Sequence, residues 1–286
     1  MHMKGIEDAI IAVIKKAETE LPTDVIQALK KALKQETGIA KTQLETILTN
    51  IQVAKETQRP MCQDTGIQTF YVSVGTDFPF INKIQDWIIH GVQRATRDIP
   101  LRPNTVDPFT AINQKDNTGN HVPYITWDFT DGDTVTITAF PKGGGSENMS
   151  KLGMLKPGVG IEGVKDFVVA EMIKAGGNPC PPTVVGVGIG GGADLALKLG
   201  KKALLRPVGK RHSNTTIAAI EEELITRINA SGIGPMGLGG KTTVLDVHIE
   251  KAHRHPASLP VGIAVQCWAD RRATLVIHHD LQWEVQ

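Results

Sequence analysis

Three cysteines are the residues of this sequence best suited to bind a metal or to react, and each lies in a distinctive sequence context. Cys62 is followed by a glutamine and an aspartate, Cys180 lies within an Asn-Pro-Cys-Pro-Pro segment, and Cys267 precedes a tryptophan. Proline fixes φ and removes a backbone donor, so the segment around Cys180 predicts a rigid turn that a merely packed thiol does not need.

The number and spacing of the cysteines limit what they can do. They are odd in number, lie far apart and form no Cys-x-x-Cys pair, so neither a disulfide framework nor a structural zinc site is expected. Three packed, reduced thiols are the interpretation that the count alone favours. Alternatively, three thiolates from distant loops hold a [4Fe–4S] cluster at three corners and leave one iron open to substrate. Both interpretations stay open at this point.

Two segments have the composition of anion-binding loops. Residues 142–148 read Lys-Gly-Gly-Gly-Ser-Glu-Asn and follow a predicted strand, where the backbone N–H groups of Gly144 and Gly145 can converge on an anion. A flexible loop explains the same glycines equally well. Arg102 precedes a proline, which holds it extended and lets its guanidinium meet a carboxylate, although a lone surface arginine is the commoner case.

Two further glycine-rich segments resemble nucleotide-binding motifs. Residues 186–191 match Gly-x-Gly-x-x-Gly after a predicted strand, but Arg211 and His212 stand where an acidic ribose ligand belongs. A tight strand-to-helix turn is therefore favoured, with an NADP-dependent oxidoreductase as the alternative. Residues 239–242 end like a P-loop, yet an alternating, strand-like segment follows instead of a helix, which argues against nucleotide hydrolysis.

The elements that must position these residues form a mixed α/β (α+β) chain, with a helical N-terminal part followed by a mixed-sheet α/β region. Three amphipathic helices are predicted between residues 6 and 58, and further helices at 81–97, 163–174 and 214–229. Strands are predicted at 69–75, 183–187, 242–249, 261–265 and 275–278. Residues 124–129 and 134–140 alternate around Asp131-Gly132, which predicts an antiparallel hairpin.

Composition and charge narrow the class of protein. The change from helical to strand-like sequence at Arg59-Pro60 predicts an N-terminal helical subdomain, 1–60, and a mixed α/β region, 61–286, which contains the candidate cluster-binding and substrate-binding residues. The 31 basic and 30 acidic residues give a net charge of +1, which argues against nucleic-acid or membrane-surface binding. No apolar run has the length of a membrane span, and residues 1–16 do not read as a signal peptide, so a cytoplasmic location is expected.

Five motifs together resemble the α part of class I fumarate hydratases. They lie at residues 61–66, 101–104, 141–148, 178–182 and 254–256, and the similarity extends over essentially the whole chain. The resemblance implies an oxygen-sensitive hydro-lyase that interconverts (S)-malate with fumarate and water. It also implies a [4Fe–4S] cofactor with Cys62, Cys180 and Cys267 as its ligands.

The resemblance further implies a partner. The sequence lacks the C-terminal half of single-chain members, so it resembles the α subunit of the two-subunit type, in which a β subunit completes the site and α2β2 is the usual assembly. The α subunits of L(+)-tartrate dehydratases are similar too, but Pro103 and the Ser-Glu-Asn at 146–148 favour fumarate. A non-catalytic scaffold subunit is the alternative from another class.

The resemblance also suggests roles for individual residues. Asp64 is the expected proton carrier to the leaving oxygen, because a general acid must lie close to the metal-bound hydroxyl. Arg102 is expected to clamp the distal carboxylate. His255 is expected to orient substrate or assist proton transfer, with a solvent-exposed histidine as the alternative. Neutral donors to the substrate are expected from Gln63, Gly144 and Gly145. The base that removes the C–H proton is expected from the β subunit.

Overall fold

The computed structural model describes residues 3–286, which divide into two compact units built from non-contiguous segments. The first unit comprises Met1–Pro22, Asn50–Gly144 and Arg271–Gln286, and the second comprises Thr23–Thr49 and Gly145–Asp270. Residues 1 and 2, which begin the segment predicted not to be a signal peptide, lie outside the described residues. The boundary expected at Pro60 stays a prediction about independently folding domains.

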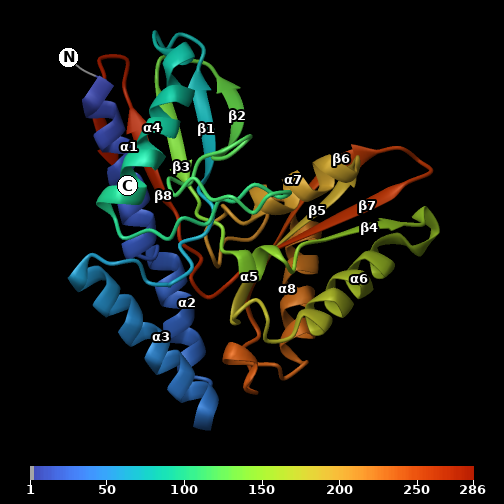
Figure 1. Cartoon of the computed structure of the whole chain (residues 1–286). Helices are drawn as coiled ribbons and strands as arrows, with labels where there is room; N and C mark the ends of the chain where they lie inside the picture. Colours follow the sequence, from blue (N-terminus) through green and yellow to red (C-terminus); the bar gives the residue numbers. More distant parts are fainter. Residues whose placement is uncertain (1–2) are drawn as a thin grey trace. The chain divides into compact units, whose positions relative to one another are not determined.

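The first unit is a five-stranded sheet covered by helices. The strand order is β2-β1-β3-β8-β9, and α1 packs against α4 and against the sheet (Figure 1). Phe70, Val72 and Val74 alternate on the buried face of β1 and join the apolar side chains of both helices in one core. The bounds are α1 (Met3–Thr19), α4 (Ile84–Asp98), β1 (Thr69–Gly75), β2 (Tyr124–Thr130), β3 (Val135–Ala139), β8 (Ala273–Ile277) and β9 (Trp283–Val285).

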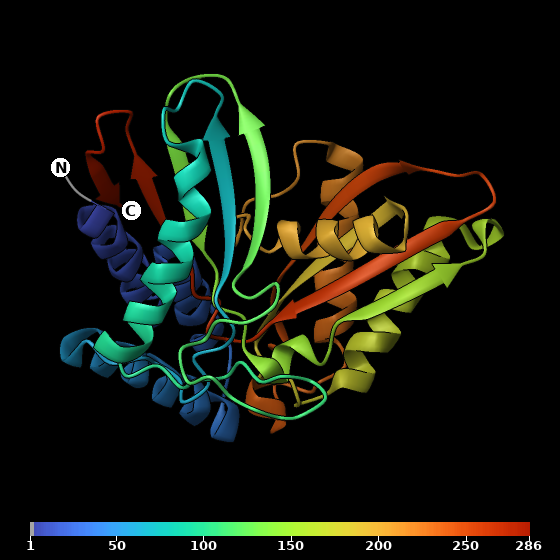
Figure 2. The same ribbon diagram turned by 45° about the horizontal axis from the view of Figure 1, so that its top comes forward.

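The hairpin predicted at residues 124–140 is wrong in its pairing. Strand β1 lies between β2 and β3, parallel to β2 and antiparallel to β3 (Figure 2). The turn at Asp131-Gly132 instead passes over the end of β1, where Asp77 donates its N–H to the carbonyl of Gly132 at 2.9 Å. A Cβ on Gly75 would lie 2.2 Å from the Gly132 oxygen, so glycine is needed there. The turn signal predicted the chain reversal but not the strand that fills the space between its arms.

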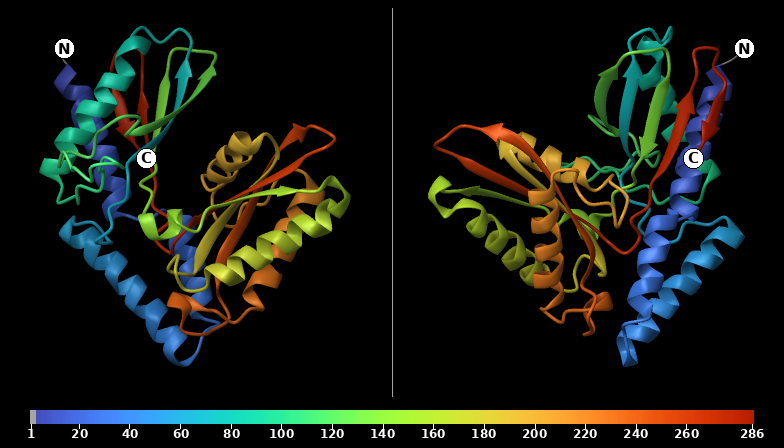
Figure 3. Two further views of the ribbon diagram at one scale, coloured as in Figure 1. Left: turned by 45° about the vertical axis from the view of Figure 1, so that its right-hand side comes forward. Right: turned by 180° about the vertical axis from the view of Figure 1, so that it is seen from behind.

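The second unit is a four-stranded sheet with helices on both faces. Its strand order is β4-β7-β5-β6, with β5 and β6 parallel and the other neighbours antiparallel. Helix α7 covers one face, and α6 and α8 cover the other (Figure 3). The bounds are α2 (Thr23–Leu33), α6 (Gly160–Ala175), α7 (Ala193–Ala203), α8 (Thr215–Asn229), β4 (Lys151–Leu155), β5 (Thr183–Gly191), β6 (Val244–Arg254) and β7 (Leu259–Gln266).

The remaining helical elements are short or contribute to both units. They are α3 (Gly38–Thr57) and α5 (Gly144–Glu147), with 3-10 turns at Ile81–Lys83, Pro157–Val159 and Pro235–Gly237. The arrangement confirms the predicted fold class, a helical N-terminal part followed by mixed sheets. Among the described residues, no helix combines the length and apolarity that crossing a membrane requires.

The Gly-x-Gly-x-x-Gly segment is explained by helix–sheet packing. Its first two glycines lie inside β5 and not in the loop that follows it. A Cβ on Gly186 would lie 2.0 Å from the Gly200 oxygen, and one on Gly188 would lie 2.0 Å from the Ala196 oxygen. Both oxygens belong to α7, so this helix rests directly on the backbone of the strand. The turn predicted there begins only at the end of the pattern, where Gly191 has a φ of +68°.

Because α7 leaves no room for a methyl group, we expect Gly188→Ala to lower the free energy of unfolding by roughly 1–3 kcal/mol. Urea unfolding followed by circular dichroism measures this loss. The matched control is Gly158→Ala, since a Cβ at that exposed glycine would meet nothing within 4 Å. Equal stability of the two variants would contradict the packing role.

Candidate functional site

The loop that follows α3 carries Cys62 and Asp64, and hydrogen bonds fix the Asp64 carboxylate from several sides. Its Oδ1 accepts the N–H of Gly66 at 2.9 Å and the Nδ2 of Asn104 at 3.3 Å. Its Oδ2 accepts the N–H of Gly144 at 2.8 Å. Three segments of the first unit therefore converge on one half-buried carboxylate, whereas the neighbouring Gln63 is exposed.

The glycine-rich loop at residues 142–145 reaches Asp64 because two backbones approach closely. Ile67 and Lys142 exchange two backbone hydrogen bonds of 3.0 Å. A Cβ on Gly66, whose φ is +69°, would lie 2.7 Å from the Lys142 carbonyl carbon. The anion that the Gly144 N–H meets in this structure is thus a carboxylate of the chain itself. The substrate-binding roles of Gly144 and Gly145 stay predictions.

Arg102 combines a fixed backbone with an exposed side chain. Its N–H donates to Thr65 Oγ1 at 3.1 Å, and its carbonyl accepts the Nδ2 of Asn117 at 3.0 Å. No hydrogen bond or ion pair of its guanidinium occurs among the described residues. The role of Arg102 as a carboxylate clamp stays a prediction.

A buried ion pair contacts the backbone of the loop that carries Asp64. Arg271 Nη1 lies 3.1 Å from Glu18 Oε2, and both residues are almost completely buried. Arg271 also donates from Nη2 to the backbone carbonyl of Asp64 at 2.6 Å, and Glu18 accepts the N–H of Met61 on its own carbonyl at 2.9 Å. The pair therefore holds the loop at both ends of the Met61–Asp64 stretch.

Burial raises the pKa of Glu18 from its ordinary 4.5 to about 7. The positive charge of Arg271 and a hydrogen bond of 3.1 Å from Gln68 lower this pKa but do not cancel the desolvation, to which the negative charge of Asp64 adds. Glu18 was missed by the sequence analysis. Its signal was a charged residue four positions after Ile14, on the apolar face of the first helix. Arg271 carried no such signal.

Cys180 and Cys267 come together in the second unit. Trp268, which follows Cys267, donates its N–H to the carbonyl of Cys180 at 3.2 Å. Cys180 has a φ of +55°, a conformation that is sparsely populated outside glycine and concentrates at functional sites. Both thiols are half-buried, as is Cys62 in the first unit, and no disulfide joins any of the three within the described residues.

His255 lies in the connection between β6 and β7, where its neighbour Arg254 shapes the turn. Arg254 Nη1 donates to the carbonyls of His255, Pro256 and Ser258, each at 3.0 Å. The exposed His255 ring accepts the N–H of Ala257 on Nδ1 at 3.1 Å, which leaves Nε2 to carry the proton of the neutral ring. His248, in strand β6, is fully buried, and its Nε2 lies 3.1 Å from Asp246 Oδ2.

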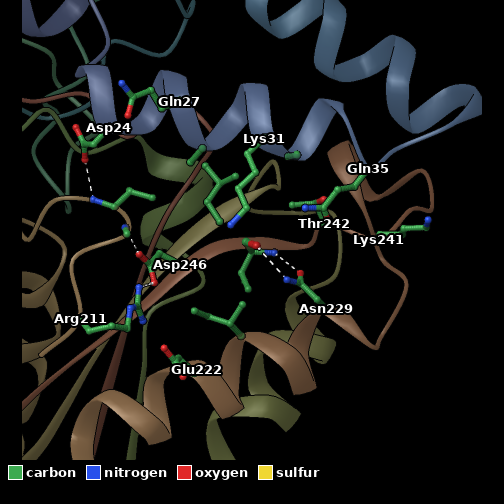
Figure 4. A pocket seen from close by; sticks show the side chains of 17 residues that line it. Asp24, Gln27, Lys31, Gln35, Arg211, Glu222, Asn229, Lys241, Thr242 and Asp246 are labelled. Carbon is green, nitrogen blue, oxygen red and sulfur yellow. Dashed lines mark hydrogen bonds and ion pairs between the residues drawn. The ribbon is translucent and has the colours of Figure 1, made fainter. Parts of the chain in front are cut away.

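A pocket of about 520 Å3 lies in the second unit, between α2, α8 and the start of β6, but it contains none of the predicted site residues (Figure 4). Some of its polar groups bond to one another. Asp24 accepts the N–H of Val208 at 2.7 Å, and Asp246 pairs with Arg211. Among the described residues, no group of three or more His, Cys, Asp or Glu side chains is arranged to hold a metal ion.

The loop that ends like a P-loop is closed by a side chain of the same unit. Glu36 accepts the N–H of Lys241 at 2.8 Å and that of Thr242 at 2.6 Å. The next element is strand β6, whereas a phosphate site of this kind needs a helix N-terminus. The structure thus agrees with the exclusion of nucleotide hydrolysis.

Comparisons with known proteins agree on one family. The sequence model of the family described as Fumarate hydratase (Fumerase) matches residues 7–276. A protein of Methanocaldococcus jannaschii with the provisional name L(+)-tartrate dehydratase subunit alpha is 52% identical over 273 residues, which cover 94% of this chain and 96% of that relative. The L(+)-tartrate dehydratase subunit alpha of Escherichia coli O157:H7 is 42% identical over 268 residues, which cover 93% of this chain and 88% of the relative.

The buried Glu18 predicts a pH-dependent stability. Because its folded pKa lies above its ordinary value, the folded state binds more protons between pH 4.5 and about 7. Its contribution to the free energy of unfolding is therefore complete below this window and is lost as pH rises through it, by on the order of 3 kcal/mol.

Urea unfolding at several pH values measures this dependence. Glu18→Gln should flatten the decline relative to the unchanged chain, whatever its effect on absolute stability. Glu20→Gln, at a half-buried carboxylate just beyond α1, serves as the control and should keep the decline. Parallel curves for all three proteins would remove Glu18 as the cause.

Proposed function

Because the chain belongs to the fumarate hydratase (Fumerase) family, we propose that it is the α subunit of a hydro-lyase whose active site a β subunit completes. The observation that carries the proposal is the Asp64 carboxylate, held by three N–H donors two residues after Cys62. Adding or removing water requires a positioned proton carrier of this kind.

The first candidate substrate pair is (S)-malate and fumarate. It is favoured by Pro103 and by the Ser-Glu-Asn at residues 146–148, which resemble fumarate hydratases. L(+)-tartrate is the second candidate, because the relatives from both organisms carry that name. The two hydroxy diacids share both carboxylates and the leaving hydroxyl, so the same residues serve either reaction and only the second hydroxyl of tartrate needs a further partner.

The proposed cofactor is a [4Fe–4S] cluster with Cys62, Cys180 and Cys267 as ligands. The donor chemistry fits this group, because all three thiols are half-buried on loops and none is joined to another in a disulfide. When bound through three cysteines, such a cluster supplies an iron that acts as a Lewis acid on the substrate hydroxyl.

Asp64 is the proposed proton carrier. Both of its carboxylate oxygens accept N–H groups, which holds the side chain in one orientation with its acceptor character intact. During hydration the carboxylate takes a proton from the attacking water. During dehydration the same group returns that proton to the leaving oxygen, as microscopic reversibility demands.

The remaining proposed roles bind and orient the diacid. Arg102 pairs with the distal carboxylate through its exposed guanidinium, and Gln63, which is also exposed, adds a neutral donor with Gly144 and Gly145. His255 orients substrate or assists proton transfer through Nε2, because its Nδ1 accepts a backbone N–H. The base for the C–H proton comes from the β subunit, with α2β2 as the proposed assembly.

The proposal is tested by anaerobic co-expression with the cognate β subunit and parallel assays on (S)-malate and L(+)-tartrate. We expect the complex to turn over malate with the higher kcat/KM and the isolated chain to be inactive. A higher value for tartrate would establish the second candidate. A complex that contains no iron or sulfide and turns over neither diacid would contradict the proposal and support the alternative of a non-catalytic scaffold subunit.

Asp64→Asn replaces the carboxylate with an amide of similar size, which can neither take up nor return the proton. In the reconstituted complex we expect kcat to fall by about 10²–10⁴-fold, with the iron and sulfide content unchanged. Asp77→Asn, at an exposed turn of the same unit, is the matched control. Unchanged turnover of the Asp64 variant would exclude it as the proton carrier.

A further inference from the structure

A loop of the first unit presents large apolar side chains to solvent. Phe109 is 95% exposed, Ile112 is 65% exposed and Val106 is 52% exposed. Pro108 and Ala111 between them are exposed as well. Single exposed apolar residues are ordinary on soluble proteins, but a contiguous group of this kind marks an interaction surface. We call these five residues the apolar tip.

The apolar tip is held in shape by its own hydrogen bonds. Asp107 Oδ1 accepts the N–H of Phe109 at 3.0 Å, the N–H of Thr110 at 2.8 Å and the hydroxyl of Thr110 at 2.9 Å. Its backbone N–H donates to the carbonyl of Ile112 at 2.9 Å. Asp107, the one charged residue between Val106 and Ile112, therefore uses Oδ1 in bonds within the loop, while the five apolar side chains stay exposed.

The base of this loop belongs to the candidate site. Asn113 donates from Nδ2 to the carbonyl of Pro103 at 2.6 Å, next to Arg102. The following residue, Asn104, donates to Asp64 Oδ1 and also to the carbonyl of Gly66 at 3.0 Å. Hydrogen bonds of Asn113 and Asn104 thus connect the loop that carries the apolar tip to Asp64, the proposed proton carrier. A partner bound at the tip would therefore lie on a segment that is connected to the candidate site.

We propose that the apolar tip docks into an apolar pocket of the β subunit, with Phe109 as its central anchor. This inference rests on the proposed function, which supplies the partner. Two relatives are named as α subunits, so a second subunit exists for them, and the tip continues directly from residues of a site that the second subunit completes. A second copy of this chain is the competing occupant, but nothing ties it to the Arg102–Asn104 segment.

The proposal is tested by the affinity of the purified full chain for its purified cognate β subunit, measured by biolayer interferometry under anaerobic conditions. A central aromatic anchor predicts that Phe109→Ser raises Kd about tenfold or more. Ile112→Ser should weaken binding in the same direction. The matched control is Phe129→Ser, because this phenylalanine is 65% exposed on the edge strand β2 of the same unit and should leave Kd within about twofold.

Circular dichroism and thermal unfolding of each isolated variant check that the fold is kept, which the exposure of these side chains favours. Equal affinity of the unchanged chain and both tip variants overturns the proposal, as does a chain that does not bind the β subunit at all. Loss of self-association without loss of β binding assigns the tip to a second copy. A complex that forms normally but turns over neither diacid overturns the proposed function, while its Kd series still decides the docking.

Discussion

The buried guanidinium of Arg271 is the group on which the geometry of the Cys62–Asp64 loop depends. It faces Glu18 of α1 and the carbonyl of Asp64, so it ties the first helix and the segment before β8 to one loop. Removing one partner of a buried ion pair costs about 3–5 kcal/mol, because the other charge stays desolvated. The backbone N–H groups of Gly66 and Gly144 then fix the carboxylate of Asp64. Its position therefore depends both on the ion pair and on these hydrogen bonds.

Glycine residues have several different structural roles in this chain, and a sequence motif alone does not distinguish them. At Gly66 a left-handed φ and a close backbone approach bring the 142–145 loop to Asp64. At Gly186 and Gly188 the missing side chain admits α7 onto the sheet. At Gly75 it lets a turn cross the end of β1. The same residue type thus builds the site in one unit and the core in the other.

Local structure was largely predictable from the sequence, whereas long-range contacts were not. Strand β1 has the predicted bounds, the three N-terminal helices form where periodicity placed them, and the predicted strand at 183–187 is completely buried. The prediction of a hairpin was wrong because a turn motif indicates that the chain reverses but does not show which strands pair. Here β1 pairs with both β2 and β3. The bonds of Asp64 to Gly144 and to Arg271 join residues far apart in sequence, so neither periodicity nor spacing could predict them.

The discontinuity of the first unit has a consequence for how the chain folds during synthesis. When residue 270 has been added, every segment of the second unit has been synthesised, but the first unit still lacks Arg271, β8 and β9. Strand β3 then has an unpaired edge, and Glu18 has no counter-charge. The loop that bears Cys62 and Asp64 therefore reaches its final shape only after Arg271 and β8 have been synthesised and have left the ribosome.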